Sequence, residues 1–482
     1  MRTGRDNPHG MAWMERRRGT GGLSGSRLLL LGTLALVCAM LLSVATGEAG
    51  EADPNVRAKV KLAVIPFAGS ADGLPEGFGF VPAQAVDVAL QRVRGVSVVE
   101  AGRIVESAER LGFSPTENLS DEALLRLARD LKVRGLITGS FILDGDAVKI
   151  RARLVDLAGQ GRVALGEEIA GPAKEYLAAP RRIVKDALQQ FQVRPTELDE
   201  RRLDAALGSE PSSLEAYALY ARAAWEQELG PKEAHDRAIA LLTKALEADQ
   251  NFAAARVALG VSLYATNNRW KASGEFRKAI QIDSRLAEAH KLLGDMLVTS
   301  PRRLYDQAIQ SYSAALEIWP DYAEARVGLG DAKQAKGQFD EAIEEYKKAI
   351  TLEPENARVH YGMGKIYYNE KQLYHEAVAE YKQAIALDPR LLDAYLSLGE
   401  MYEEKGLYQD AVASYSHVLS VEPKNPGAAY GLALSYEKLD VKKAIEQWER
   451  YIELASSLPS EKDWADIAKK HLEKLRRGEK PR

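Results

Sequence analysis

A unit of about 34 residues recurs through the second half of the chain and restricts the fold more than any other feature. The segment AEARVGLGDAKQAKGQFDEAIEEYKKAITLEPEN (323–356) is one copy. In every copy a small residue ends the first apolar turn of one helix, an alanine opens the next helix, and a bulky residue follows four positions later. The seven alanine and bulky pairs are Ala238 and Leu242, Ala272 and Phe276, Ala308 and Tyr312, Ala342 and Tyr346, Ala377 and Tyr381, Ala411 and Tyr415, and Ala444 and Trp448. Two helices approach closely only where small side chains lie at the contact, so the pattern predicts stacked helical hairpins.

The period and pattern resemble the tetratricopeptide repeat, or TPR, a helical hairpin that stacks into a superhelix. The copies are placed at 214–252, 253–286, 287–322, 323–356, 357–391, 392–425 and 426–458. An insertion near QELGPKEAH predicts a long loop inside the first copy, and Val441–Lys443 shortens the turn of the last. A polar helix at 460–477, with Ser460 as its N-cap, is expected to cap the open stack.

The resemblance implies where a partner would bind, because positions 2, 5, 9 and 12 of the first helix line the concave groove of TPR arrays. Carried onto this chain, these positions predict a partner-binding groove. Its residues are Arg222, Trp225, Tyr264, Lys291, Asp295, Asp331, Tyr361, Lys365, Tyr368, Glu400 and Tyr430. No copy has the asparagine at position 9 that chaperone-type TPR clamps use to hold a terminal carboxylate. The mixture of aromatic and charged side chains favours a protein partner, bound as a peptide or a helix.

The fourth copy is dense in carboxylates, which raises the question of a metal or acid/base site. Asp340, Glu341, Glu344 and Glu345 lie off the stripe of Ala342, Tyr346 and Ala349. They are expected to form an outer solvated face, with Glu344 paired to Lys348 one turn on.

The region before the repeats, 58–192, has the texture of an α/β domain. Apolar runs predict strands and amphipathic runs predict helices, with Pro82 in a first helical turn and Ser120 as an N-cap. The expected order is strand 60–67, helix 81–93, strand 96–100, helices 102–112 and 120–132, three strands within 133–171, and a helix at about 173–191. The fold class predicted for the chain is therefore an α/β amino-terminal domain followed by an all-α TPR solenoid.

Two stretches of this domain carry a second resemblance. LAVIPF, followed by LARDLKVRGLITGSFILDGDAVKIRARLVDLAGQG, resembles the TolB-like domain that also occurs in FlgO-like envelope proteins. The usual Asn-x-Ser after the Pro-Phe is replaced by AGSADG. The resemblance implies a non-catalytic module of envelope or regulatory assemblies.

Residues that would support catalysis are scarce. No Gly-Lys-Ser/Thr sequence follows a strand, and no histidine lies between Val60 and Phe191. Cys38 is the only cysteine, which excludes a disulfide, a thiolate metal site and a cysteine nucleophile from the later domains. His290 and His360 fall at packing positions of the repeats. We therefore predict no enzyme activity, no cofactor and no metal. A net charge of −4 argues against nucleic acid as a partner.

The amino-terminal segment, 1–50, predicts export or anchoring. Arg16, Arg17, Arg18 and Arg27 precede Leu28–Ala45, which are 18 uncharged residues. Such a run fits both a cleaved signal peptide and a membrane anchor. The expected location is the cell envelope, either periplasmic or anchored in the inner membrane through 28–45. The predicted function is a scaffold that binds protein partners. One alternative is a small-molecule or nucleotide sensor that uses the TolB-like domain, with the repeats as its output. Another is a cytoplasmic regulator that its leader tethers to the membrane.

Overall fold

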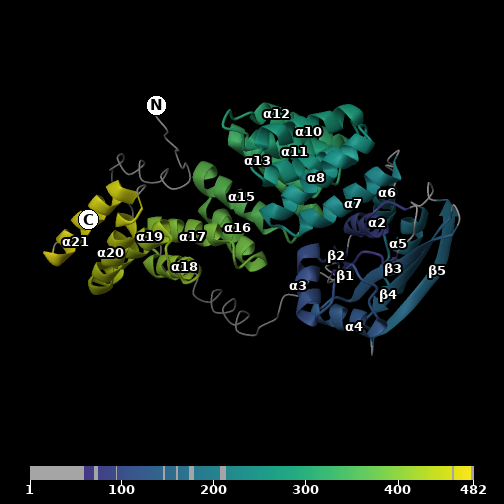
Figure 1. The fold of residues 1–482 in the computed structure, drawn as a ribbon. Coiled ribbons are helices and arrows are strands. Elements are labelled where there is room, and N and C mark those ends of the chain that lie inside the picture. The colour runs from purple at the N-terminus through teal and green to yellow at the C-terminus, as the bar shows by residue number, and fades with distance from the viewer. Residues whose placement is uncertain are drawn as a thin grey trace, which may run out of the picture. The chain divides into compact units, whose positions relative to one another are not determined.

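The computed structural model describes residues 59–69, 74–93, 95–144, 147–158, 161–172, 178–206, 213–458 and 461–478. The expected leader and anchor at 1–50 and the proposed N-cap Ser460 lie outside these residues. Among the helices that are described, none is long and apolar enough to cross a membrane. The chain divides into two compact units, one ending at Pro320 and one beginning at Asp321. The α/β region is followed by a long run of helices, as predicted (Figure 1).

The first unit opens with a mixed five-stranded sheet. Its strands are β1 (Val60–Val64), β2 (Val96–Val98), β3 (Gly135–Asp144), β4 (Ala147–Asp156) and β5 (Arg162–Pro172). Their order is β2-β1-β3-β4-β5, with β1 parallel to β2 and β3 and the last three strands antiparallel. The three later strands match the expected hairpins, whose tips lie in part outside the described residues.

Helices cover both faces of the sheet, because successive strand residues point to opposite faces and apolar side chains occur on both. The helices are α2 (Phe80–Gln91), α3 (Ala101–Leu111), α4 (Asp121–Asp130) and α5 (Ala178–Gln190). Val148, Ile150 and Leu154 of β4 join the core that includes α2 and α5. Val155, one position on, joins the core beneath α3 and α4. The Ser120 side chain accepts a hydrogen bond from the N–H of Ala123, so the predicted N-cap of α4 is confirmed.

Helix α6 (Glu197–Ala206) links this region to the repeats and was not predicted from the sequence. Thr196 and Asp199 cap it reciprocally. The Thr196 N–H donates to the Asp199 carboxylate at 2.8 Å, and the Asp199 N–H donates to the Thr196 hydroxyl at 3.2 Å. This is a capping box, and the spacing of Thr196 and Asp199 was the signal that would have revealed it.

The helices that follow α6 pair as consecutive helical hairpins. They pair α7 (Leu214–Glu228) with α8 (Lys232–Ala248), α9 (Ala253–Ala265) with α10 (Arg269–Ile282), α11 (Ala287–Val298) with α12 (Tyr305–Ile318), α13 (Ala323–Lys336) with α14 (Phe339–Leu352), α15 (Ala357–Ile366) with α16 (Tyr374–Leu387), α17 (Leu392–Glu404) with α18 (Tyr408–Val421), and α19 (Pro426–Leu439) with α20 (Val441–Ser456). The polar helix α21 (Lys462–Arg476) follows and packs on α20.

Two details of the hairpins test expectations about their turns. The long loop expected in the first repeat is absent, because α7 ends at Glu228 and α8 begins at Lys232. The inserted residues lengthen the two helices instead. The short turn expected in the last repeat is confirmed, since Asp440 alone separates α19 from α20 and its carboxylate accepts from the N–H groups of Lys442 and Lys443.

The predicted pairing of small and bulky residues is also confirmed. A Cβ added to Gly330 of α13 would lie 2.5 Å from the Tyr346 ring of α14, and one added to Gly399 would lie 2.6 Å from the Tyr415 ring. These tyrosines are buried, so the helix spacing within each hairpin depends on the missing side chain.

Candidate partner-binding groove

The predicted groove residues of the first repeat are covered by the chain's own α/β region. Trp225 of α7 packs beside Phe80 of α2, with ring centroids 6.0 Å apart, and joins the core beneath α3 and α4. Arg222 donates to the Glu76 carboxylate at 2.9 Å. These side chains therefore form an internal interface in this structure.

A second part of that interface holds two carboxylates. Asp87 of α2 and Glu228 of α7 line a cavity about the size of one water molecule, together with Val64, Ala83 and Val99. Burial raises the pKa of Asp87 to about 8, and the charge of Glu228 adds to the rise. Burial also raises the pKa of Glu228, although the Ala101 N–H donates to it.

The end of α2 reaches the third repeat. The Arg92 guanidinium lies 4.7 Å from the ring centroid of Trp319 and 3.7 Å from the Glu288 carboxylate. Arg202 of α6 lies 5.2 Å from the same ring. The α/β region and the first three repeats are thus packed together in one unit.

The predicted groove residues of the second and third repeats are partly engaged within their own repeats. Lys291 pairs with Asp295 at 2.8 Å, and the Tyr312 hydroxyl donates to Asp295 at 2.7 Å. Tyr264 is 41% exposed, and the Arg269 guanidinium lies 5.4 Å from its ring centroid.

In the second unit, Asp331 is engaged in a similar way to Asp295. It accepts a 2.7 Å hydrogen bond from the Tyr346 hydroxyl within its own repeat, and it pairs with Arg358 of the next repeat at 2.5 Å. Burial, followed by the Asp331 charge, raises the pKa of Tyr346 well above its ordinary value. Asp331 therefore joins two repeats, which is a structural role for a predicted groove residue.

The fifth and sixth repeats bring four predicted residues together. The Lys365 ammonium lies 5.6 Å from the Tyr361 ring centroid, and Glu400 is close enough to raise the pKa values of Tyr361 and Tyr368. Burial is the larger cause of the rise in both tyrosines, and the pKa of Tyr361 rises to about 12. We call Tyr361, Lys365, Tyr368 and Glu400 the groove cluster.

Three further side chains lie beside the groove cluster and were missed from the sequence. The hydroxyls of Tyr368 and Tyr374 both donate to Glu404, the latter at 3.2 Å. The Lys405 ammonium lies over the Tyr374 ring. Tyr368 lies on the π-helical turn η3 (Tyr367–Lys371), which ends at Gln372 in a left-handed conformation. The extra residue of this 35-residue repeat was the available signal, because π turns accommodate single insertions.

Glu400 is the least compensated member of the groove cluster. Burial raises its pKa to about 7, and the neighbouring Glu403 adds to the rise. Among the residues that the structure describes, no hydrogen-bond or ion-pair partner of the Glu400 side chain is found. A cation placed beside it would favour its ionised form.

Tyr430 is buried rather than exposed to a groove. Its ring packs edge-on against Trp448, Tyr451 and Trp464, with centroids 5.1, 5.2 and 5.8 Å away. Trp464 belongs to α21, and His471 of the same helix lies 2.8 Å from Glu437. The capping helix therefore covers the groove position of the seventh repeat.

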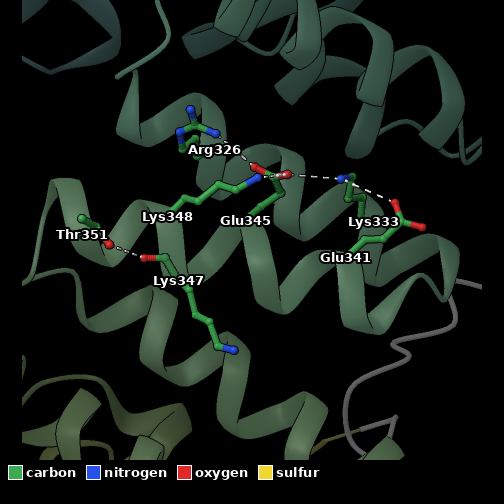
Figure 2. Close-up of polar contacts among 7 residues, drawn as sticks. All are labelled: Arg326, Lys333, Glu341, Glu345, Lys347, Lys348 and Thr351. Carbon is green, nitrogen blue, oxygen red and sulfur yellow. Dashed lines mark hydrogen bonds and ion pairs between the residues drawn. The ribbon is translucent and has the colours of Figure 1, made fainter.

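The acidic helix α14 differs from the expected solvated face at one residue. Glu345 is buried and pairs with Arg326 at 3.2 Å, Lys333 at 3.4 Å and Lys348 at 3.2 Å (Figure 2). The expected pair of Glu344 with Lys348 is wrong, because Glu344 pairs with Lys347 at 3.1 Å. Glu345 lies beside the packing stripe, on the side that faces α13. The spacing of apolar residues along α14 does not reveal that a charged residue beside the stripe is buried.

Repeat packing also accounts for His360, which lies 2.7 Å from Glu380 of its own hairpin. His290 lies 3.1 Å from the Ser284 carbonyl oxygen. Within the described part of the chain, no group of three or more His, Cys, Asp or Glu side chains is arranged to hold a metal ion.

Comparison with known families identifies the hairpins. Models described as "TPR repeat" and "Tetratricopeptide repeat" match residues 303–345, 330–370, 368–406, 392–425 and 428–457. The hairpins within these ranges are tetratricopeptide repeats. The sequence-based identification is therefore confirmed for this region.

Solved structures of TPR proteins align with part of the chain. They include MamA, at 29% identity over 33% of this chain and 91% of that one, with a TM-score of 0.30. YrrB, titled a TPR protein with an unusual peptide-binding site, shows 21% identity over 39% and 96%, with a TM-score of 0.33. PilF of Pseudomonas aeruginosa shows 22% identity over 45% and 96%, with a TM-score of 0.39. No curated protein matches the chain.

Proposed function

We propose that this protein is a non-catalytic scaffold of the cell envelope that binds a protein segment at the groove cluster. The observation that carries the proposal is the juxtaposition of Tyr361, Lys365, Tyr368 and Glu400 on neighbouring repeats. Two groove positions elsewhere are covered, with Trp225 against α2 and Tyr430 beneath α21. The groove cluster is thus where we expect a partner to bind.

The chemistry of the groove cluster favours a partner segment that carries a lysine or arginine. Tyrosine rings supply contact area at low entropic cost and bind cations through their faces. Glu400 is half-buried beside Glu403, so a partner cation there would offset their mutual repulsion. Repeat proteins commonly bind extended segments or helices in such grooves.

The envelope part of the proposal rests on the sequence. The basic residues and the uncharged run Leu28–Ala45 support export, either with cleavage or with retention as an inner-membrane anchor. The resemblance of the α/β region to TolB-like domains supports the same compartment. A reporter enzyme fused after residue 50 and active only outside the cytoplasm should be active, and an inactive, stable fusion would contradict export.

Photocrosslinking in cells tests the groove cluster. A crosslinking amino acid at position 361 or 368 should capture the same partner. One at position 382, on the exposed side of α16, serves as the matched control and should not. Recovery of the same products from 361 and 382, or of none from 361 and 368 in a folded chain, would exclude the groove cluster as the binding site.

The sensor alternative receives no support from the described α/β region. The cavity between α2 and α7 is of water size, far below the volume that a nucleotide or sugar requires. A thermal-shift screen with nucleotides and sugars remains the direct test, and we expect no shift.

A further inference from the structure

The second repeat exposes a tryptophan that TPR packing does not require. Trp270, at the start of α10, is 85% exposed. It stands two residues before Ala272, which opens the packing stripe of the helix. The other repeats carry polar residues at this position. They are Asp236, Asp306, Asp340, His375, Gln409 and Lys442.

The neighbouring position explains why the indole points outward. Most later repeats have an aromatic residue three before the alanine, as at Phe339, which packs partly against its own hairpin. In the second repeat Arg269 takes that position and the aromatic residue moves on by one. One residue rotates a helical position by about 100°, which moves the ring off the packing face.

Four cations flank Trp270 along its own turn and the turn of the third repeat. The turns 264–273 and 296–305 contain Arg269, Lys271, Arg302 and Arg303 and no Asp or Glu. All four cations are exposed, and no ion pair is formed by any of them among the described residues. Asp306 lies one residue beyond the second segment, at the position that Trp270 takes in the second repeat. The turns of the fourth to sixth repeats include acids of their own, such as Asp340, Glu370 and Asp410.

The two turns lie on one edge of the first unit. Helix α10 begins at Arg269, and α11, which packs against it, ends at Val298 just before the second turn. Consecutive antiparallel helices bring the start of one beside the end of the next. We call Tyr264, Arg269, Trp270, Lys271, Arg302 and Arg303 the Trp270 edge.

We propose that the Trp270 edge binds the surface of an anionic lipid bilayer. Indole rings are enriched at the boundary between headgroups and hydrocarbon, because one end of the ring is apolar and the other donates a hydrogen bond. Lysine and arginine bind lipid phosphates while their stems cover apolar surface. The edge thus combines one insertable ring with four cations.

Charge and shape favour a bilayer over other anionic partners. The cations are on two turn tips around one exposed ring, which a flat surface can contact together. Nucleic-acid sites instead line several aromatic rings along a basic groove. The edge does not depend on the groove cluster. If the run Leu28–Ala45 is retained as an anchor, tethering raises the local concentration of bilayer and makes weak contacts sufficient.

Vesicle binding tests the proposal with the chain from residue 51, which contains every described element. Sedimentation with phosphatidylcholine vesicles that contain phosphatidylglycerol should bring the protein down, and pure phosphatidylcholine should not. Added salt should weaken binding. Brominated lipid should quench the part of the tryptophan fluorescence that comes from Trp270 in the wild type. This quenched part should be absent from Trp270→Asp.

The variants separate binding from folding. Trp270→Asp introduces the residue that three other repeats carry at the same position, so the fold should persist. We expect it to weaken vesicle binding at least about tenfold. Lys271→Gln should weaken it about fivefold. The matched control Lys244→Gln removes an exposed cation from α8 and should leave binding nearly unchanged.

The opposite results are equally clear. Failure of the folded wild type to bind anionic vesicles, or equal binding by Trp270→Asp, overturns the proposal. A single-stranded oligonucleotide that binds with the same dependence on Trp270 would assign the edge to nucleic acid instead. Tyr361→Ala should bind vesicles normally, so loss of the partner at the groove cluster leaves this inference standing.

Discussion

The carboxylate of Glu228, at the end of α7, accepts a 2.9 Å hydrogen bond from the backbone N–H of Ala101, the first residue of α3. Helix α3 has no side-chain cap of its own, since Glu100 forms none. The first repeat therefore caps a helix of the α/β region across 127 residues of sequence. A carboxylate at this place also interacts favourably with the positive end of the α3 helix dipole.

Removing this cap should destabilise the first unit. Glu228→Ala leaves the Ala101 N–H without a partner, which we expect to lower the free energy of unfolding by about 1–3 kcal/mol. Denaturant unfolding followed by circular dichroism measures the change. Glu228→Gln keeps an acceptor and is the matched control. An Ala variant as stable as the Gln variant would show that the hydrogen bond does not stabilise the interface.

Stability should depend on pH through Asp87. Its folded pKa of about 8 lies above its ordinary value, because of burial and then the charge of Glu228. Between about pH 4 and pH 8 the folded chain binds more protons than the unfolded chain, so this contribution to stability falls as pH rises. Asp87→Asn should abolish that decline and be more stable than the wild type near pH 8. Parallel unfolding curves of the two proteins across this window would contradict it.

Two glycines in helix interiors should respond oppositely to alanine. At Gly330 a Cβ would lie 2.5 Å from the buried Tyr346 ring, and we expect a loss of about 1–3 kcal/mol. At Gly274 a Cβ meets nothing within 4 Å, so Gly274→Ala should stabilise by up to about 1 kcal/mol. Chemical denaturation of both variants compares them. Equal effects would mean that close helix approach does not explain Gly330.

Adjacent glutamates on α14 should also differ. Glu345→Ala leaves Arg326 and Lys333 beside a vacated, buried position, with an expected cost of about 1–3 kcal/mol. Glu344→Ala removes only an exposed pair with Lys347 and should change stability by less than about 0.5 kcal/mol. Equilibrium unfolding near neutral pH distinguishes them. A cost for Glu344→Ala as large as that for Glu345→Ala would contradict this assignment.

Acid should reduce the advantage of Glu345. Burial raises the pKa of Glu345, but hydrogen bonds and charges from Lys348 and Lys333 outweigh it and hold that pKa below its ordinary value. The stabilisation is therefore present above the ordinary carboxylate pKa and is lost as pH falls through the lowered one. The gap between wild type and Glu345→Ala should narrow on acidification, and a gap that widens would be inconsistent with the ion-pair network.

Periodic features could be predicted from the sequence because they depend on local spacing. Small residues such as Gly399 opposite bulky residues such as Tyr415 identified the hairpins, and Ser120 identified a helix start. All four residues of the groove cluster were among the predicted groove positions, because each has a fixed place in its own repeat. The contact of Tyr368 with Glu404 was not predicted, because it joins residues from different repeats.

The sequence by itself thus determined the hairpins and their order, because each repeat contains its own packing pattern. Only the tertiary structure decided which groove positions are available. Trp225 has the repeat position of the exposed Tyr264, and Tyr430 has that of the half-buried Tyr361, yet α2 covers Trp225 and α21 covers Tyr430. Burial of this kind depends on contacts between distant segments, and no local periodicity encodes it.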